Sequence, residues 1–439
     1  MEDAYVIKGA RPLKGKLQLS GAKNIALKVL IAALLFDSPV VLHNIPRICD
    51  IEALIDLLKL LGVQIYHTHN TVTIDPRTLQ KNKVDLLHAS KIRVSFLLFA
   101  PLLYTFQKAE IPNPGGCRLG ARSIDRIVDG LRTLGVMITY NSKTGYYEAS
   151  ILGQPHGEYT FEKPSHTGTE LMIMMSVFCD GVVRIKNAAQ EPEIDDLITM
   201  LNEGGANIHR EDCEIIIKGV HTLTQKKPFT ISADRVEAVT YAVLGIATRG
   251  DITISKIPDH YILAFIDVLQ NAGAGVEQKG HGVWRFYYKP MRTIDIETAP
   301  HPGFLTDWQP LLAVLMTQVK GKSTIHERIF ENRFSYVEEL RKLGATVEFI
   351  KPMITNPHEY YFFNYEAGKE YMQSIAITGP LDLHGGVLTV SDLRAGATLA
   401  IAALVADGES YVKGVHHIER GYENFVEKVR SLGGEIRKF

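Results

Sequence analysis

The stretch LLKLLGVQIY, residues 57–66, contains a pattern that returns five more times along the chain. In each copy a helix-like apolar segment ends at a glycine and a β-type alternation follows. The other copies are GLRTLGVMITY (130–140), MLNEGGANIH (200–209), VLQNAGAGVEQ (268–278), ELRKLGATVEF (339–349) and KVRSLGGEIRKF (428–439). The matching glycines are Gly62, Gly135, Gly205, Gly273, Gly344 and Gly433, spaced 73, 70, 68, 71 and 89 residues apart.

The residues of the first copy show why the pattern has structural meaning. Ile55, Leu58 and Leu61 recur at three-residue intervals, which indicates one face of an amphipathic helix. A glycine directly after such a helix supplies the left-handed backbone of a C-cap. The alternation that begins at Val63 and Ile65 then predicts a half-buried strand.

A second pattern precedes these units: a strongly apolar helix, a turn and a short strand, as in IAALLFDSPVVLHNIP (31–46). A repeat of about 70 residues is too long for a solenoid, whose repeats run roughly 20 to 50 residues. Six copies divide naturally as three plus three. We therefore expect two similar α/β domains with helices inside and sheets outside, and a substrate cleft between them. One irregular α/β domain is the alternative, which the six copies disfavour.

Two stretches interrupt the regular spacing. The polar stretch HTLTQKKPF (221–229) lies between the third and fourth copies and is a candidate crossover between the domains. A Tyr-rich, polar stretch around 356–374 accounts for the long last spacing.

Composition excludes several classes of protein. The 439 residues contain 48 Lys and Arg against 49 Asp and Glu, a formal net charge of −1, whereas a broad nucleic-acid binder needs a basic surplus. The longest apolar stretch, 94–104, is far short of the roughly 20 residues of a membrane span. The N-terminus begins acidic and has no apolar signal region, so we expect a cytoplasmic protein.

Nothing in the pattern of cysteines, histidines and carboxylates predicts a bound metal. The four cysteines are scattered without a C-x-x-C pair, which favours neither a disulfide framework nor a zinc site. Histidines and carboxylates do not cluster at ligand spacing, so we expect no metal and no cofactor. The sequence carries no signal for an oligomeric state.

Several polar residues are not explained by the repeat. Lys23 and Asn24 fall at the start of an apolar helix, where backbone N–H groups and the helix dipole favour an anion. The alternative for Lys23 is a solvated surface lysine. Arg394 in SDLRAGA and Arg420 in HIERGY also precede helices. If they converge, the three cations would form a receptor for a small, multiply charged anion.

Two further segments carry candidate catalytic groups. In PGGCRLGAR (114–122) a glycine-rich loop holds Cys117 next to Arg118 and near Arg122, and nearby cations favour a reactive thiolate. A passive loop cysteine is the alternative. In TAPHPGFLTD (298–307) Asp307 precedes an apolar helix, either as a catalytic carboxylate or as a group that caps the first turn.

Eight motifs along nearly the whole chain resemble the UDP-N-acetylglucosamine 1-carboxyvinyltransferase family of enolpyruvyl transferases. In order they are LSGAKN, PGGCRLGAR, NAAQEPEI, ADRVEA, TAPHPGFLTD, FENRF, SDLRAGA and HIERGY. The resemblance implies two inside-out α/β domains, each of three βαβαββ repeats, with the active site in the interdomain cleft. It places repeats 1–3 and the Cys117 loop in 23–232, and repeats 4–6 in 1–22 plus 233–439, with crossovers near 22 and 232.

The resemblance also implies a reaction. The enolpyruvyl group of phosphoenolpyruvate passes to the 3'-hydroxyl of UDP-N-acetylglucosamine by addition and elimination, with release of phosphate, in the first committed step of peptidoglycan synthesis. Fosfomycin sensitivity and roles in cell shape and division follow for the family.

The resemblance assigns roles to particular residues. For phosphoenolpyruvate it implies Lys23, Arg122 and Arg420, with Arg394 at the carboxylate. Cys117 is implied as the group that protonates C3, and Asp307 as the base for the sugar hydroxyl. For the nucleotide sugar it implies Asn24, Arg93, Arg122, Asp125, Lys163, Ser165, Asp307 and the backbone of Ile329.

One segment departs from the family pattern, and two rival functions remain. Residues 165–170 read Ser-His-Thr-Gly-Thr-Glu, where Ser-Val-Gly-Ala-Thr is commoner, so Thr167 stands where a glycine backbone usually lies near the diphosphate. The related shikimate-pathway synthase is disfavoured, because its Asn-Ala-Gly-Thr signature is missing at 91–95 and it needs no loop cysteine. A non-catalytic nucleotide-sugar sensor is the rival from a different class.

Overall fold

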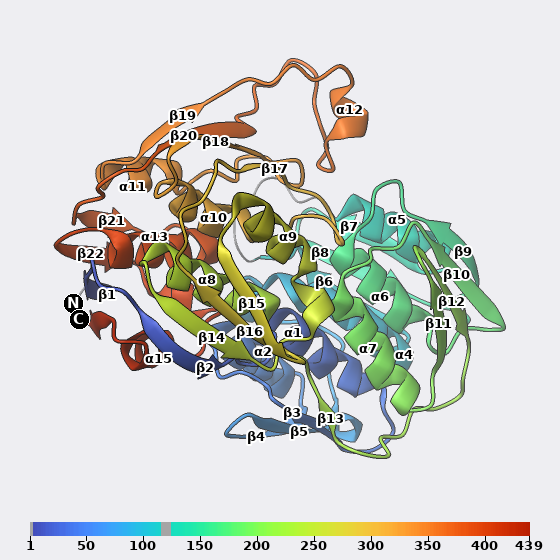
Figure 1. The fold of residues 1–439 in the computed structure, drawn as a ribbon. Helices are drawn as coiled ribbons and strands as arrows, with labels where there is room; N and C mark the ends of the chain where they lie inside the picture. Colours follow the sequence, from blue (N-terminus) through green and yellow to red (C-terminus); the bar gives the residue numbers. More distant parts are fainter. Residues whose placement is uncertain (1–2, 116–123) are drawn as a thin grey trace. The chain divides into compact units, whose positions relative to one another are not determined.

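The computed structural model describes residues 3–115 and 124–439, which form two compact units (Figure 1). The middle unit comprises residues 21–115 and 124–232. The split unit comprises residues 3–20 and 233–439. The division therefore falls after Ser20 and after Ser232. The stretch 221–229 packs within the middle unit, because Leu223 is fully buried and the Gln225 side chain bonds to both backbone groups of Val41.

The middle unit contains three sheets and the helices that cover them. In the first sheet the strand order is β13 (Phe229–Thr230), β3 (Val40–His43), β5 (Thr71–Asp75), β4 (Gln64–Thr68). In the second it is β6 (Lys108–Pro112), β8 (Tyr146–Ser150), β7 (Met137–Asn141). In the third it is β11 (Asn207–Glu211), β12 (Glu214–Lys218), β10 (Val182–Lys186), β9 (Gly157–Thr160). The helices are α1 (Lys23–Ala32), α2 (Cys49–Leu60), α3 (Leu86–Ala89), α4 (Phe99–Phe106), α5 (Asp125–Thr133), α6 (His166–Ser176) and α7 (Pro192–Glu203), with 3-10 turns η1 (Ala33–Leu35), η2 (Pro76–Thr78) and η3 (Arg93–Leu98).

The split unit likewise contains three sheets and the helices that cover them. The strand order of its first sheet is β15 (Gly275–Gly280), β16 (Val283–Tyr287), β14 (Asp251–Ser255), β2 (Lys14–Gln18). The second sheet has the order β17 (Asp295–Glu297), β18 (Gly321–His326), β20 (Ser374–Gly379), β19 (Thr346–Phe349). The third has the order β21 (Val387–Thr389), β22 (Glu409–Lys413), β1 (Ala4–Lys8), β23 (Glu435–Lys438). Its helices are α8 (Arg235–Ala247), α9 (Leu263–Ala272), α10 (Gln309–Met316), α11 (Val337–Lys342), α12 (Pro357–Tyr360), α13 (Leu393–Val405), α14 (His416–Glu419) and α15 (Phe425–Ser431), with the 3-10 turn η4 (Asp259–Tyr261).

The sheets share one strand order, which confirms the predicted α/β repeat. A central strand pairs on one side with a parallel strand and on the other with the antiparallel end of a hairpin, as β18 does with β17 and β20. In the sheet β21, β22, β1, β23 the antiparallel pair β1 and β23 takes the place of the hairpin. In the sheet β6, β8, β7, a single parallel bridge from Lys83 to Glu110 takes the place of the parallel strand. The hairpin of the fifth repeat, β19 and β20, carries the predicted insertion, which includes α12.

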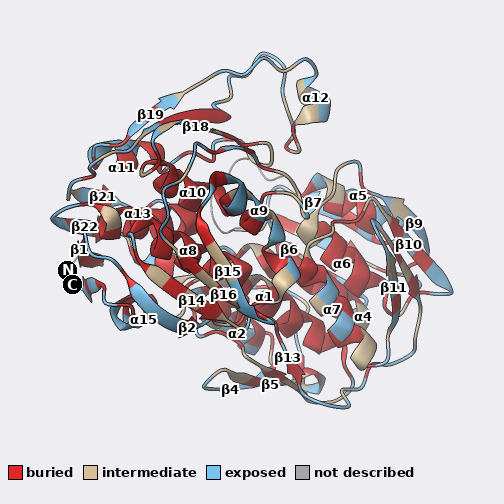
Figure 2. Cartoon of the chain, viewed as in Figure 1, coloured by how far each residue is buried: buried red, intermediate tan, exposed pale blue. Residues whose placement is uncertain are grey.

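Within each unit the apolar helices lie inside, as predicted, and appear red in Figure 2. All residues of α8 and α10 are buried, and α1 leaves only Asn24 partly exposed. A helix that is apolar on all sides must be covered on all sides. Many strands, in contrast, alternate between buried and partly exposed residues, as β5 and β14 do, and such strands keep one face toward solvent. The strands β1 and β20 instead begin with four buried residues in a row.

The six repeat glycines all have the left-handed backbone that the sequence predicts. Their φ angles lie between 84° and 107°. In every copy the residue after the glycine donates its N–H to a carbonyl five residues earlier, as Val63 does to Leu58, at 2.9–3.2 Å. This is the hydrogen bond of a Schellman C-cap. The glycine thus ends the helix and turns the chain into the next strand.

This geometry predicts a measurable cost of adding a side chain. Gly205 has φ +107° and open space around an added Cβ, so Gly205→Ala should lower the free energy of unfolding by about 1–2 kcal/mol through the backbone alone. Gly153 has equally open space but no such φ, so Gly153→Ala should be neutral or slightly stabilising. Urea denaturation followed by circular dichroism measures both. Equal effects of the two substitutions would contradict the argument.

Candidate functional site

Asp307 is held in the split unit by two arginines. Its Oδ1 accepts a hydrogen bond from Arg333 Nη2 at 2.6 Å, and its Oδ2 accepts one from Arg394 Nη2 at 3.0 Å. The helix α10 starts two residues later with no side-chain cap, so Asp307 does not cap it. The Asp307 side chain is 26% exposed, against 1% for Arg333 and 8% for Arg394. The carboxylate is therefore oriented by two buried guanidinium groups and is itself partly exposed.

The local sequence fixes Arg394 at the start of α13. Asp392 caps this helix and accepts from the N–H groups of Arg394 and Ala395 at 2.9 and 3.1 Å. Burial by itself would lower the pKa of Arg394, but Asp307, Tyr422 and Asp234 together outweigh it, and the pKa lies above its usual value. Arg394 is thus a permanent cation in a buried place.

Arg333, in the FENRF motif, contacts Asp307 but was not among the site residues predicted from the sequence. The buried Glu327 holds the loop that precedes Arg333. Its carboxylate accepts hydrogen bonds from the N–H groups of Ile329 and Phe330 at 2.8 and 3.1 Å. Glu327 also accepts from Thr306 Oγ1 at 2.8 Å, which ties this loop to the residue before Asp307. Burial raises the pKa of Glu327, against the opposing charge of Arg333. The amide of Ile329 is therefore engaged within the protein.

Arg420 lies at the C-cap of the short helix α14 and is half-buried. The neighbouring Tyr422 is buried, and its hydroxyl lies 2.8 Å from Thr240 Oγ1 on α8. Burial raises the pKa of Tyr422 to about 12, so this phenol stays neutral. The HIERGY motif is thereby fixed against the central helix of the split unit.

In the middle unit Lys23 forms a buried ion pair. It is the first residue of α1, and its Nζ lies 2.6 Å from Oδ2 of Asp50 in the first turn of α2. The two side chains are 11% and 9% exposed. The interpretation of Lys23 as a solvated surface lysine is therefore wrong. A charged lysine stays at a helix start because a carboxylate from the next helix compensates it.

The other predicted residues of the middle unit lie mostly at the starts of helices. Asn24 is the second residue of α1, Asp125 begins α5, and Arg93 begins η3. Burial lowers the pKa of Arg93. Lys163 is half-buried, and burial and then Arg126 lower its pKa.

The segment that departs from the family pattern forms the start of α6. Ser165 caps the helix by accepting from the N–H of Gly168 at 3.2 Å. Thr167 lies in the first helical turn, and its backbone is not among those with positive φ, so no glycine is required there. Cys117 and Arg122 lie outside the described residues, and their predicted roles stay predictions.

A buried charged cluster lies behind this segment. Lys28 Nζ and His166 Nε2 each lie 3.2 Å from Oε1 of Glu170. The side chains of Lys28 and Glu170 are 5% and 0% exposed, whereas that of His166 is 23% exposed. Polar residues at 28, 166 and 170 in otherwise apolar helices were the only sequence signal for this cluster.

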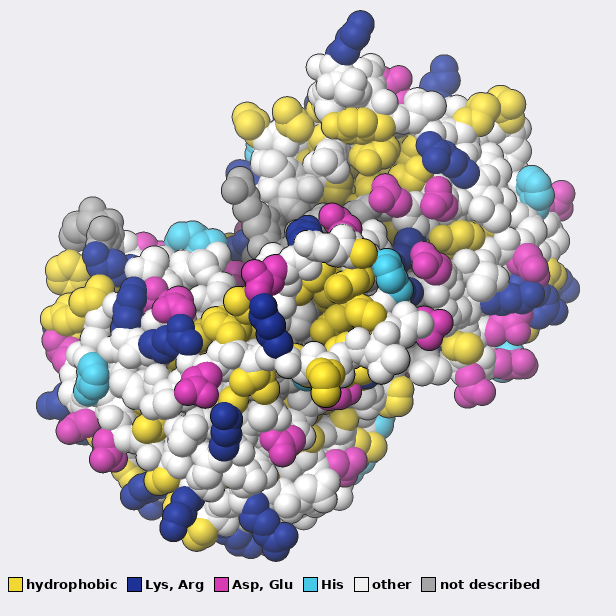
Figure 3. Space-filling view, turned by 90° about the horizontal axis from the view of Figure 1, so that it is seen from above, with side chains coloured by type: hydrophobic (Ala, Val, Ile, Leu, Met, Phe, Trp, Pro, Cys, Tyr) yellow, Lys and Arg dark blue, Asp and Glu magenta, His cyan; other side chains and the backbone are white. Residues whose placement is uncertain are grey.

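A surface hollow of about 760 Å³ lies on the sheet β15, β16, β14, β2 of the split unit. Lys14, Lys16, Lys279 and Arg285 line it, but Arg285 already pairs with Asp251 and Glu277, and Lys279 with Glu277. None of the predicted site residues in the described part of the chain lines this hollow. On the face drawn in Figure 3, basic and acidic side chains are likewise intermixed.

Two searches of the described chain bear on other classes of site. No group of three or more His, Cys, Asp or Glu side chains in residues 3–115 and 124–439 is arranged to hold a metal ion. Over the same residues no helix has the length and apolarity needed to cross a membrane.

Comparison with known proteins gives consistent matches over the whole chain. The sequence pattern of EPSP synthase (3-phosphoshikimate 1-carboxyvinyltransferase) matches residues 7–429. The UDP-N-acetylglucosamine 1-carboxyvinyltransferases of Desulfosudis oleivorans and Idiomarina loihiensis are each 36% identical over 439 residues, covering 99% of this chain and 99% of theirs.

Two solved structures have a similar fold. The enolpyruvyl transferase NikO from Streptomyces tendae superposes with a TM-score of 0.85 at 22% identity, covering 100% of this chain and 99% of that one. EPSP synthase from Acinetobacter baumannii superposes with a TM-score of 0.71 at 17% identity, covering 100% of both chains. At such identities the likeness concerns the fold alone.

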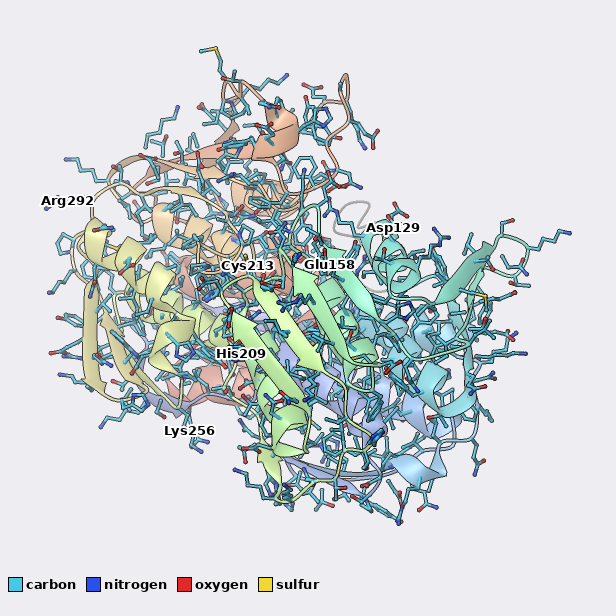
Figure 4. All side chains as sticks on the ribbon, turned by 90° about the vertical axis from the view of Figure 1, so that its right-hand side faces the viewer. Asp129, Glu158, His209, Cys213, Lys256 and Arg292 are labelled. Atoms are coloured by element: carbon cyan, nitrogen blue, oxygen red, sulfur yellow. The ribbon has the colours of Figure 1, made fainter. Side chains whose placement is uncertain are left out.

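The buried Lys23–Asp50 pair leads to a stability prediction. Asp50→Asn leaves Lys23 without its buried counterion and should lower the free energy of unfolding by about 3–5 kcal/mol. Glu158 pairs with Lys186 at 2.8 Å on the sheet that faces the viewer in Figure 4, and their side chains are 56% and 41% exposed. Glu158→Gln is the matched control, with an expected change below about 1 kcal/mol. Urea denaturation followed by circular dichroism measures both, and a small loss for Asp50→Asn would refute the prediction.

Proposed function

We propose, from the premise that this chain belongs to the EPSP synthase family, that it transfers the enolpyruvyl group of phosphoenolpyruvate to the 3'-hydroxyl of UDP-N-acetylglucosamine. Phosphate is the second product. The proposal rests on sequence similarity to enzymes named for this activity. These enzymes are 36% identical to this chain over 99% of both chains. The reaction is the first committed step of peptidoglycan synthesis, and we place it in the cytoplasm, with cell shape and division depending on it.

The negative charges of the donor, phosphoenolpyruvate, account for the lysine and arginine residues of the proposed site. Phosphoenolpyruvate carries a phosphate and a carboxylate, and we assign Lys23, Arg122 and Arg420 to this donor, with Arg394 at its carboxylate end. The planar guanidinium suits both groups, because two parallel N–H bonds match two oxygens. Lys23 and Arg394 are buried and already oriented by Asp50 and Asp307. Such preset charges need little reorganisation when the substrate binds.

The chemistry needs an acid and a base. In the addition step a proton is added to C3 of phosphoenolpyruvate while the sugar oxygen bonds to C2 and gives up its own proton. We assign the acid to Cys117 and the base to Asp307. In the elimination step a proton leaves C3, the C2–O bond to phosphate breaks, and the enol ether forms. Asp307 has the partly exposed carboxylate that this role requires.

The acceptor is assigned to a second set of residues. For the nucleotide sugar these are Asn24, Arg93, Arg122, Asp125, Lys163, Ser165, Asp307 and the backbone of Ile329. The groups that lie at the starts of helices suit a diphosphate, since helix N-termini present N–H donors and a positive dipole end.

The decisive experiment measures phosphate release from the purified full chain. Release with phosphoenolpyruvate and UDP-N-acetylglucosamine together, and none with either alone, supports the proposal. Binding of the nucleotide sugar without release would indicate a sensor instead. Release with shikimate 3-phosphate in place of the nucleotide sugar would indicate the shikimate-pathway reaction.

Asp307→Asn tests the assignment of the base. The amide keeps the shape of the side chain but cannot take a proton, so kcat should fall by about 100-fold or more. The dissociation constant of UDP-N-acetylglucosamine should change less than about fivefold. Steady-state kinetics and calorimetry separate the two. A large loss of affinity with unchanged kcat would move Asp307 to a binding role.

Cys117 is tested by chemistry on the thiol. Cys117→Ser should lose most turnover, because the hydroxyl is a far weaker acid than the thiol. Fosfomycin, an epoxide that resembles the donor, should alkylate Cys117 and add its mass to the peptide that contains it. An unmodified thiol after saturating treatment would count against this role. Cys213, exposed at the turn between β11 and β12, is the internal control (Figure 4).

A further inference from the structure

Glu327 is a buried carboxylate to which the proposed reaction gives no role. It follows the strand β18 directly and is fully buried. Its Oε1 accepts hydrogen bonds from the N–H groups of Ile329 and Phe330, and its Oε2 accepts one from Thr306 Oγ1 at 2.8 Å. A buried carboxylate is costly unless its oxygens are paired, and here both oxygens are. The surrounding protein therefore fits this carboxylate closely.

The backbone of Glu327 is fixed by Gln373, the last residue of the insertion before β20. The N–H of Glu327 donates to the carbonyl of Gln373 at 2.7 Å. In return, the buried side chain of Gln373 donates from Nε2 to the carbonyls of Glu327 and Phe330 at 2.8 and 3.1 Å. Both backbone groups and both carboxylate oxygens of Glu327 are thus bonded within the protein. The carboxylate is therefore held in a defined position.

One of the three hydrogen bonds to the carboxylate is not needed to form the local turn. The N–H groups of Ile329 and Phe330 lie two and three residues after Glu327, so their bonds form the turn itself. The bond from Thr306 comes instead from a segment 21 positions earlier in the chain. Thr306 directly precedes Asp307. This third bond therefore joins the turn to the backbone next to the proposed base.

A second connection between Glu327 and Asp307 is made by Arg333. The turn that Glu327 holds is followed within a few residues by Arg333. Arg333 Nη2 donates to Asp307 Oδ1 at 2.6 Å, and the charge of Arg333 also acts on Glu327. The Arg333 side chain is 1% exposed, so the protein rather than solvent sets its position. The backbone and the side chain of Asp307 are thus each connected to the Glu327 turn.

The position of a general base affects the rate of the step it catalyses. A base must lie within hydrogen-bond reach of the proton it takes, and a displacement of about 1 Å can lower a rate about 100-fold. We propose that Glu327 and Thr306 are positioning residues for Asp307, and that their hydrogen bond keeps its carboxylate where the sugar hydroxyl loses its proton. This role rests on the proposed function, in which Asp307 is the base.

Thr306→Val tests the bond with a side chain of the same shape and no hydroxyl. The kcat should fall about tenfold, because Asp307 is less firmly held, while the dissociation constant of UDP-N-acetylglucosamine should stay within about twofold. Thr306→Ser keeps the hydroxyl, and Glu327→Gln keeps an acceptor for the two N–H groups and an N–H for the oxygen of Thr306. Both should retain kcat within about threefold. Steady-state kinetics and calorimetry measure these values. An unchanged kcat in Thr306→Val, or an equal loss in either conservative variant, would overturn the proposal.

A double-mutant cycle separates positioning from a general structural defect. In the Asp307→Asn background the base is already absent, so Thr306→Val should change kcat by less than about twofold. A further loss of about tenfold there would overturn the proposal. Thr324→Val is the matched control, because Thr324 Oγ1 also donates to an aspartate, Asp295 Oδ1, at 2.6 Å, but at the exposed surface of the sheet. It should leave kcat unchanged in both backgrounds, and a loss equal to that of Thr306→Val would also count against the proposal.

Crystal structures of the wild type and of Thr306→Val separate this role from the proposed function. Wild-type protein that releases no phosphate from the two substrates would overturn the proposed function, and the structures would still decide the positioning role. The Asp307 carboxylate should be displaced from Arg333 in the variant only. A carboxylate in the same place in both structures would overturn the positioning role. If circular dichroism shows that Thr306→Val does not fold, Thr306→Ala removes the same donor and replaces it in every comparison.

Discussion

The repeat depends on one backbone constraint: after each amphipathic helix the chain must adopt a left-handed residue. At Gly205 and Gly433 an added Cβ would meet no atom within 4 Å, so space does not explain the glycine there. The positive φ does, because an L-side chain then approaches its own carbonyl. The Schellman bond that follows sends the chain into a strand within a few residues, as from Leu60 at the end of α2 to Gln64 at the start of β4. Helix and hairpin must then pack on each other.

Strands from distant parts of the chain complete the repeats. β1 lies between β22 and β23, in the position that β20 holds in the fifth repeat. β2 pairs in parallel with β14, and β13 pairs in parallel with β3. The first strands of the chain therefore belong to sheets formed by its last two hundred residues. The pairings of β1 join residues about four hundred positions apart, such as Ala4 and Lys413, and require most of the chain to be present.

The sequence allowed prediction of what is local and periodic. The glycines, the apolar helices and the hairpin insertion follow from patterns within a few residues, and the structure confirms them. The ion pairs could not be predicted this way, because Lys23 and Asp50 belong to different helices and Asp307 and Arg394 are 87 positions apart. A lysine at a helix start looks the same in sequence whether it faces solvent or a carboxylate. The roles of the site residues came from the resemblance and all stay predictions, and Cys117 and Arg122 also lie outside the described residues.

The cost of burying these charges indicates what they are for. A buried ion pair contributes little to stability compared with apolar residues of the same volume, because removing two charges from water is expensive. Yet Lys23, Arg333 and Arg394 are all buried against carboxylates from other segments. Packing alone would favour apolar side chains at these positions. A transferase whose substrates carry phosphate and carboxylate groups has a use for them, because charges already fixed in place stabilise a reacting anion without reorganising.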